Sequence, residues 1–197
     1  AALAAEAPAA VTTRVLRLPS VAGGRALDAV AAALAAADGP VAIVAADLVV
    51  SEAALAPLTA DPHVRTSLLV RPGLSVPPGS TASAHGVRVR HHRATSVGTG
   101  FHDVTAPDHV SVGALVVGAA DAAASGAAVD GLAAALDAGA VTSDGEDLVE
   151  LVALALVRGG VEVAAVDLVD VPWFRSPADS AAARADAERV PADRIAQ

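Results

Sequence analysis

The chain has 197 residues, 54% of them hydrophobic and 18% charged, which is enough apolar material to form one folded domain. Its 13 basic and 22 acidic side chains give a formal charge of −9, which excludes nucleic-acid binding through a basic surface. The absence of cysteine excludes disulfides, cysteine-ligated zinc and a thiol nucleophile. No apolar run reaches the roughly 20 uncharged residues of a membrane span. We therefore expect a single soluble domain over 1–197, with no nucleic-acid partner and no direct membrane insertion.

The first part of the chain alternates between strand and helix patterns. The expected elements are a strand over 11–18, a helix over 26–37, a strand over 41–46, a short helix capped by Ser51, and a strand over 64–70. The fully apolar run 41–46 is typical of a buried parallel strand. A β-α-β-α-β order predicts right-handed crossovers and a three-layer α/β domain.

The middle of the chain interrupts this alternation. Residues 72–86 are rich in Pro, Gly and Ser and predict a surface loop. Apolar and polar residues alternate over 87–90, which predicts a strand, and a second strand that runs back beside it is expected over 95–104. Together they predict an antiparallel insertion spanning about 85–110. The expected fold is therefore a three-layer, mostly parallel sheet with helices on both faces and an antiparallel insertion.

The last part of the chain returns to strands and helices. The expected elements are a strand over 112–117, a helical region over 119–138 interrupted at Gly126 and Gly131, a helix opened by the capping box 143–146, a strand over 161–169, a turn over 172–175, and a helix starting at Ser176.

Asp47 is the most informative acidic residue. It follows the apolar run 41–46, and open α/β sheets bind ligands at the carboxyl ends of their strands. A carboxylate there can hold a Mg²⁺ ion that bridges nucleotide phosphates, so Mg²⁺ is the cofactor this interpretation implies. The alternative is that Asp47 only stabilises the turn after the strand, and both interpretations stay open.

A nucleotide site also needs a glycine-rich loop after the first strand. The candidate is segment 20–25, in which Gly23, Gly24 and Arg25 are the possible nucleotide-binding residues. This segment matches neither the P-loop nor the dinucleotide fingerprint, and a plain turn is favoured. The missing loop argues against full catalysis.

Histidines gather in the expected insertion, at His85, His91, His92, His102 and His109. Adjacent histidines on a strand face opposite ways, so solvated or cross-strand roles are favoured over a metal site. His102, Asp103 and Ser111 have the residue types of a catalytic triad, but no nucleophile-elbow sequence surrounds the serine.

Several acidic residues are secondary candidates. Glu146, Asp147 and Glu150 lie at the start of the expected helix, where the helix dipole favours them, and the capping box explains Glu146. Asp147 or Glu150 is a candidate for a second metal carboxylate, although a solvated helix face is favoured. Asp170 is a further metal candidate, with turn stabilisation as its alternative.

Trp173 and Phe174 are two of the three Phe, Trp and Tyr residues of the chain. They are candidates for stacking on a base or for a partner surface, with a place at the end of the core as the favoured alternative.

The order of these features resembles the nucleotidyltransferase-like fold of sugar-phosphate and inositol-phosphate nucleotidyltransferases. The resemblance is carried by Ala46-Asp47-Leu48, by 111–117, and by Trp173 followed by 176–179. The second half resembles the domain that precedes the membrane part of actinobacterial CDP-alcohol phosphatidyltransferase family proteins. The segments that carry this second resemblance are 101–104, 111–117, 147–163 and 173–177.

The resemblance implies a cytoplasmic domain whose partner is the membrane-embedded phosphatidyltransferase domain of a parent protein, a phospholipid-synthesising enzyme. That membrane domain is expected beyond Gln197, and the transferase motif of spaced Asp and Gly residues is absent from this chain. In the nucleotidyltransferase comparison Asp47 matches the metal-binding position, and Asp170 or Asp179 lies near the second acidic position. The glycine-rich nucleotide loop of the family is missing.

Three functions follow as hypotheses. The first is a degenerate nucleotidyltransferase-like domain, a pseudoenzyme with a binding, regulatory or scaffolding role. The second is an active Mg²⁺-dependent cytidylyltransferase that makes a CDP-alcohol, with Arg25 as the basic residue. The third is an unrelated α/β interaction module. A nucleotide such as CTP or CDP is the expected small ligand, and a homodimer is left open.

Overall fold

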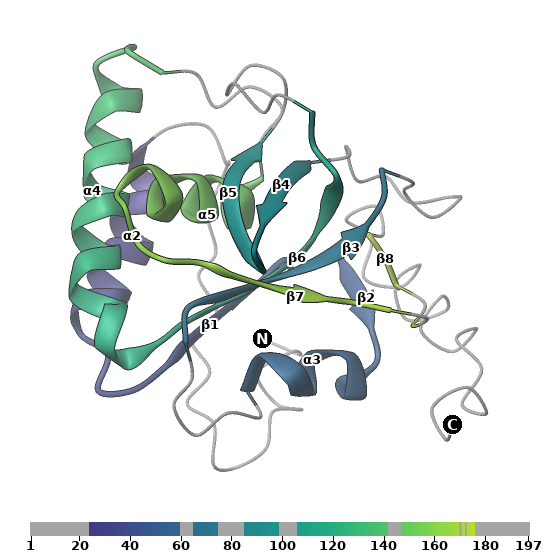
Figure 1. The fold of residues 1–197 in the computed structure, drawn as a ribbon. Helices are drawn as coiled ribbons and strands as arrows, with labels where there is room; N and C mark the ends of the chain where they lie inside the picture. Colours follow the sequence, from purple (N-terminus) through teal and green to yellow (C-terminus); the bar gives the residue numbers. More distant parts are fainter. Residues whose placement is uncertain are drawn as a thin grey trace.

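The computed structural model describes residues 24–59, 65–74, 85–98, 106–141, 147–169, 171 and 173–175 (Figure 1). The expected strand over 11–18, the capping box and the helix from Ser176 lie outside these residues. In chain order the described elements are α2 (Gly24–Ala35), β1 (Val41–Val44), β2 (Leu48–Val50), α3 (Glu52–Thr59), β3 (Ser67–Pro72), β4 (Gly86–Arg90), β5 (Arg93–Gly98), β6 (His109–Val117), the short 3₁₀ helix η2 (Ala119–Asp121), α4 (Ala122–Asp137), α5 (Leu148–Arg158), β7 (Ala164–Asp167) and β8 (Trp173–Arg175).

The main sheet has the strand order β1-β6-β3-β7-β5-β4. Because β6 also pairs with β4, five of these strands close into a barrel-like ring, with β1 attached outside it. Strands β2 and β8 form a separate antiparallel pair. The expected α/β class is confirmed, but the arrangement is a barrel-like sheet, not the expected open one.

The expectation of a mostly parallel sheet is wrong. Only β3 and β7 pair in parallel, and every other pairing among the described strands is antiparallel. The reason is that β6 runs between β1 and β3 in the opposite direction to both. A strand that is buried on both faces is continuously apolar whichever way it runs, so composition alone does not reveal its direction.

The antiparallel hairpin over β4 and β5 is confirmed, but it belongs to the main sheet. Its strand β4 pairs with β6, and β5 pairs with β7 at Arg93 and Ala164. The turn of the hairpin places His91 and His92 at φ of 50° and 59°. These two histidines therefore lie in an exposed turn and not on a strand.

Three further details differ from expectation. Helix α4 runs without interruption through Gly126 and Gly131, because single glycines weaken a helix without ending it. The segment expected as a turn over 172–175 contains strand β8, which pairs with β2. Strand β1 is half exposed in an alternating pattern and pairs antiparallel with β6, so it is not a buried parallel strand.

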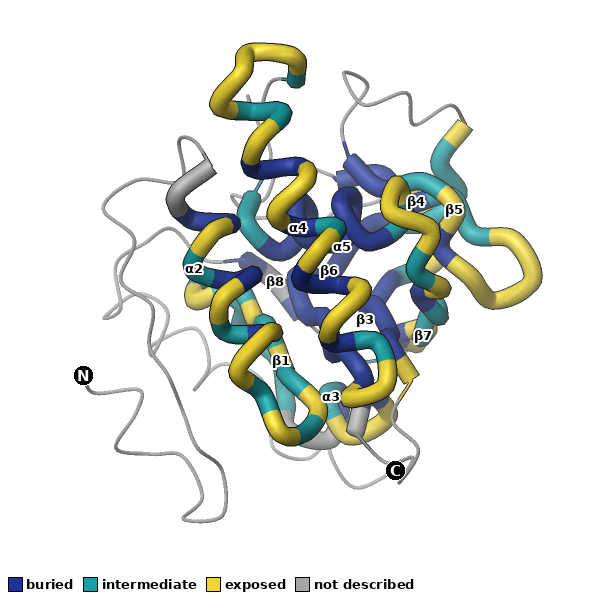
Figure 2. The backbone as a smooth tube through the Cα atoms, turned by 90° about the vertical axis from the view of Figure 1, so that its left-hand side faces the viewer, coloured by how far each residue is buried: buried dark blue, intermediate teal, exposed yellow. Residues whose placement is uncertain are grey.

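Two apolar cores lie on the two faces of the sheet, and β6 contributes to both because its side chains alternate. Leu115 and Val117 pack with α2, α4 and α5, whereas Val112 and Val116 pack with α3. Figure 2 shows α2 and α4 side by side, each with an exposed outer face and a buried inner face. Helices therefore cover both faces of the sheet, as expected.

Within the part of the chain that the structure describes, every helix is too short or too polar to cross a membrane.

Candidate functional site

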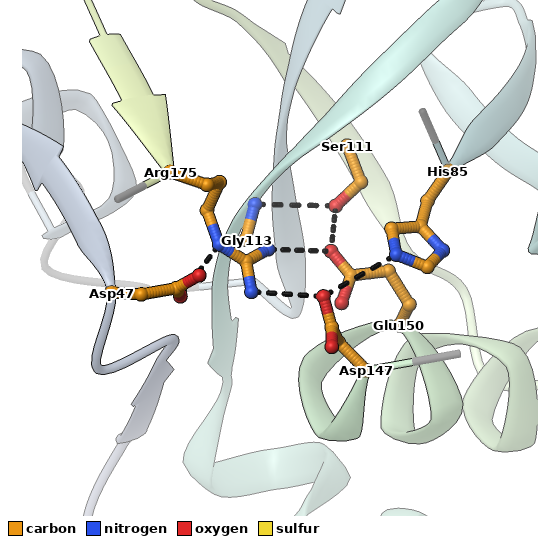
Figure 3. Close-up of polar contacts among 7 residues, drawn as sticks. All are labelled: Asp47, His85, Ser111, Gly113, Asp147, Glu150 and Arg175. Atoms are coloured by element: carbon orange, nitrogen blue, oxygen red, sulfur yellow. Dashed lines mark hydrogen bonds and ion pairs between the residues drawn. The ribbon is translucent and has the colours of Figure 1, made fainter. Parts of the chain in front are cut away.

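A cluster of charged side chains surrounds the guanidinium group of Arg175, the last residue of β8 (Figure 3). The pairing of β8 with β2 places Arg175 opposite Leu48, and thus beside Asp47 in the turn before β2. Strand β6 contributes Ser111 and Gly113, and the start of α5 contributes Asp147 and Glu150. The cluster joins segments that are up to 128 positions apart in the sequence.

Arg175 contacts three carboxylates. Its Nε donates to Asp47 Oδ1 at 2.7 Å, and its Nη2 donates to Asp147 Oδ2 at 2.9 Å. Its Nη1 lies 3.7 Å from Glu150 Oε1. The Arg175 side chain is only 5% exposed. Because a guanidinium is planar, permanently charged and carries several donors, it can serve three carboxylates at once.

Gly113 leaves room for this guanidinium. A Cβ atom at this position would lie 2.8 Å from Arg175 Nη1 and 3.2 Å from Ala45 Cβ. The backbone also has φ of +91°, which L side chains rarely adopt. The register between β3 and β6 shifts in the same region, between Leu68 and Val70. The irregular strand thus brings β6 close to the charged cluster.

The far side of the cluster is formed by His85, Asp147, Glu150 and Ser111. His85 is 1% exposed, and its Nε2 lies 3.4 Å from Asp147 Oδ2. Ser111 Oγ donates to Glu150 Oε1 at 2.7 Å and accepts from the Gly113 backbone N–H at 3.2 Å. Glu150 is completely buried. A buried carboxylate of this kind is stable only when cations or hydrogen-bond donors compensate it.

The protonation of the cluster follows from these contacts. The pKa of Asp147 lies below its ordinary value of 3.8, mainly because of its polar contact with His85, with the positive charge of Arg175 adding to the effect and burial opposing it. Burial alone would lower the pKa of Arg175, but the negative charges of Glu150 and Asp47 raise it overall. Arg175 therefore remains a cation under all physiological conditions.

Asp147 gives the cluster a defined acid response. A carboxylate whose folded-state pKa is lowered stabilises the protein above its unfolded pKa and loses that contribution as pH falls through the folded pKa. We predict that Asp147→Asn is less stable than the unmodified chain at pH 7, and that this difference shrinks as pH falls below 3.8. Urea unfolding across this pH range measures both curves.

The control is Asp130→Asn, which makes the same substitution outside the cluster, on the exposed side of α4. A stability difference between Asp147→Asn and the unmodified chain that stayed constant with pH would show that the carboxylate charge is not involved.

A second ionic group joins the hairpin to β6. Asp108 accepts from the Val89 backbone N–H at 2.9 Å, from Arg90 Nη1 at 2.6 Å, and is paired with His109 Nδ1 at 2.7 Å. Burial would raise the pKa of Asp108, but these hydrogen bonds lower it overall. These bonds tie β4 to the residue before β6, which indicates a structural role for Asp108.

Some of the predicted site residues lie within the described part of the chain, and others lie outside it. The strand before Asp47 is shorter than the expected 41–46, because β1 ends at Val44, and Asp47 lies in the turn directly before β2. There it is paired with Arg175. Gly24 begins α2, and Arg25 follows within that helix, so this part of the expected glycine loop is helical. Gly23 and Asp170 lie outside the described residues, and so do Asp179, His102 and Asp103. The proposed roles of these residues in nucleotide or Mg²⁺ binding remain predictions.

Two expectations for other residues are wrong. Glu150 does not lie on a solvated face, because α5 is buried from Val149 to Leu156. Of the two roles expected for the histidines, a solvated one is wrong for His85, which is 1% exposed, whereas His91 and His92 are exposed as expected. For Trp173 the favoured alternative is confirmed, because it is 3% exposed and packs in the core beneath α3.

Arg175 is not among the residues that the sequence predicts for the site, and Glu150 is only a secondary candidate there. A usable signal for Glu150 was present, since a charged residue within a helix that is apolar all round has to be buried with a partner. Arg175 gave no such signal, because its position depends on the pairing of β8 with β2, which joins distant segments.

A separate hollow of about 240 Å³ lies between β1 and α3, lined by residues that include Ala42, Val44, Leu55 and Leu58. Its lining is apolar and does not include Asp47. The charged cluster and this hollow are therefore different features of the molecule.

Solved structures with a similar fold are nucleotidyltransferases. The inositol-1-phosphate CTP transferase from T. maritima matches with a TM-score of 0.53 and 16% identity, over 86% of this chain and 64% of that one. A Bacillus anthracis protein named as a glucose-1-phosphate thymidylyltransferase matches with a TM-score of 0.51 and 11% identity, over 90% of this chain and 66% of that one.

The chain thus spans slightly less than two thirds of each of these proteins. No protein-family model matches the chain, and no curated protein matches it. The comparisons establish a nucleotidyltransferase-like fold, as the sequence resemblance implied.

Proposed function

We propose that this chain is a degenerate nucleotidyltransferase-like domain with a binding, regulatory or scaffolding role. The observation that carries the proposal is the 2.7 Å hydrogen bond from Arg175 Nε to Asp47 Oδ1. The carboxylate that the sequence assigns to a metal ion already has a cationic partner from within the chain.

This partner disfavours Mg²⁺ at Asp47. A Mg²⁺ ion requires oxygen ligands at about 2.0–2.1 Å in a nearly octahedral arrangement. Among the described residues, Asp47 does not belong to a group of three carboxylates or histidines whose atoms lie close enough together to hold a metal ion, and its Oδ1 accepts a hydrogen bond from Arg175. Among the described residues, the arrangement around Asp47 therefore does not fit Mg²⁺ as long as Arg175 stays in place.

The wider setting of the proposal is phospholipid synthesis. Its support is the resemblance of the second half to the domain that precedes a membrane-embedded CDP-alcohol phosphatidyltransferase. In that setting the domain acts at the cytoplasmic face of the membrane, beside the transferase domain of its parent protein. A CTP- or CDP-binding fold without turnover would sense or hold the nucleotide that the neighbouring transferase uses.

Calorimetric titration of CTP and CDP tests the proposal. We expect the affinity for either nucleotide to be the same with Mg²⁺ and with a chelator, because the carboxylate of Asp47 is paired with Arg175. Asp47→Ala is the informative variant, and Asp130→Ala on the exposed side of α4 is its control. Nucleotide binding that requires Mg²⁺ and disappears only in Asp47→Ala would overturn the proposal.

The second candidate is an active cytidylyltransferase that makes a CDP-alcohol. It is favoured by the position of Asp47 in the turn between β1 and β2 and by the fold shared with an inositol-1-phosphate CTP transferase. This function would require Arg175 to leave Asp47, a second carboxylate such as Asp170, and a basic residue such as Arg25. It predicts pyrophosphate release from CTP, which the degenerate domain does not produce.

A further inference from the structure

The cluster around Arg175 carries more negative than positive charge. Asp47, Asp147 and Glu150 contribute three negative charges, and Arg175 contributes one positive charge, which leaves minus two when His85 is neutral. Asp47 and Asp147 are partly exposed to solvent, but Glu150 is completely buried, so its negative charge is the one that is costly unless a cation or hydrogen-bond donors compensate it.

Glu150 shows where this compensation is missing. Its side chain is completely buried, and its Oε1 accepts from Ser111. Its other oxygen, Oε2, is also buried and has no hydrogen-bond partner among the described residues. Figure 3 shows the Glu150 carboxylate turned toward Asp147 and Arg175. The Oε2 atom of Glu150 therefore indicates a positively charged ligand.

We propose that His85, Asp147 and Glu150 form a binding site for one divalent transition metal ion of the zinc class. Each residue offers a ligand atom, and these atoms all lie within 4.8 Å of one another. His85 Nε2 and Asp147 Oδ2 are 3.4 Å apart, close to the separation of about 3.3–3.4 Å expected for two ligands at about 2.0–2.1 Å from one tetrahedral metal.

The ligand types select the class of metal. An imidazole nitrogen together with carboxylate oxygens suits Zn²⁺, Co²⁺ or Fe²⁺, whereas Mg²⁺ prefers oxygen ligands alone. A divalent ion also brings the formal charge of the cluster to zero. The site differs in residues and in metal class from the Mg²⁺ position considered at Asp47, so it stands independently of the proposed function.

The surroundings support the site. Ser111 and Arg175 hold Glu150 Oε1 and Asp147 Oδ2 from outside the proposed centre, as outer-sphere partners orient the ligands in metal sites. The Asp147 side chain is 44% exposed, which gives an ion access from solvent. Three protein ligands leave a fourth position for water or a small ligand.

The test uses the full chain freed of metal with a chelator and then titrated with Zn²⁺ alone by calorimetry. We expect one Zn²⁺ per chain, a melting temperature that rises with Zn²⁺ concentration, and no comparable effect of Mg²⁺. Co²⁺ in the same protein is expected to give the visible absorption of a low-coordinate site. Failure of the unmodified chain to bind stoichiometric Zn²⁺ would overturn the proposal without any variant.

The matched variants are His85→Asn and His91→Asn, which make the same substitution in the cluster and in the exposed hairpin turn. We expect His85→Asn and Glu150→Gln to weaken Zn²⁺ binding by at least about tenfold, as loss of a ligand or its support does, and His91→Asn to leave it unchanged. Circular dichroism of each variant confirms that it is folded. Binding that is retained in folded His85→Asn, or lost in His91→Asn, would place the metal at the surface and contradict the proposal.

Discussion

Arg175→Met is expected to lower the free energy of unfolding by about 3–5 kcal/mol, the cost typical of removing one partner from a buried ion pair. The substitution removes the cation that faces Asp47, Asp147 and Glu150 and leaves Glu150 fully buried. Part of the repulsion is screened, because Asp147 is 44% exposed. Urea unfolding at neutral pH measures the effect.

Arg93→Met is the matched control. Arg93 also pairs with a carboxylate, Glu162, at 2.9 Å, but both side chains are more than half exposed. Exposed pairs of this kind contribute about 0–1 kcal/mol, so the control should lose little stability. Equal losses in the two variants would mean that the cluster does not depend on its buried cation.

Gly113→Ala is expected to cost about 2–4 kcal/mol, which combines the strain of a left-handed backbone with overpacking. The new Cβ would lie 2.8 Å from Arg175 Nη1, and the guanidinium cannot move away without breaking its contacts with the carboxylates. Ala45 would also have to shift, since its Cβ lies 3.2 Å away. Denaturant unfolding gives the loss.

Gly131→Ala makes the same substitution at a place where we expect stability to increase. Gly131 lies within α4, is exposed, and has no atom within 4 Å of an added Cβ. Alanine is a better helix former than glycine, so this variant should gain about 0.5–1 kcal/mol. A Gly113→Ala protein as stable as the unmodified chain would show that β6 does not need glycine beside Arg175.

The elements that the sequence predicted well are those with strong local patterns. Helices α2 and α5 and strand β6 lie close to their expected ranges, because amphipathic spacing and continuous apolar runs are local properties. The direction of β6 and the closing of the sheet were missed, since both depend on which distant strands pair. The α/β class that the sequence predicts is nevertheless the observed one.

The candidate site also combines features that local sequence patterns predict with features that depend on the pairing of distant segments. The position of Asp47 after an apolar strand is a local pattern, and the structure places it there. The contact between Asp47 and Arg175 depends on a pairing between β2 and β8 that no local pattern reveals. Glu150 was assigned to solvent because the first turn of a helix usually is exposed, although α5 is buried on every side.

Pyrophosphate release from CTP tests the degenerate character of the domain most directly. The assay supplies Mg²⁺ and a set of phosphorylated alcohols, including inositol and glycerol phosphates, to the full chain. We predict no release above the level without protein, because Asp47 is paired with Arg175 at 2.7 Å and belongs to no group of three described ligands that could hold the metal. Release that depends on a phosphorylated alcohol and is abolished in Asp47→Asn would contradict this and establish an active nucleotidyltransferase.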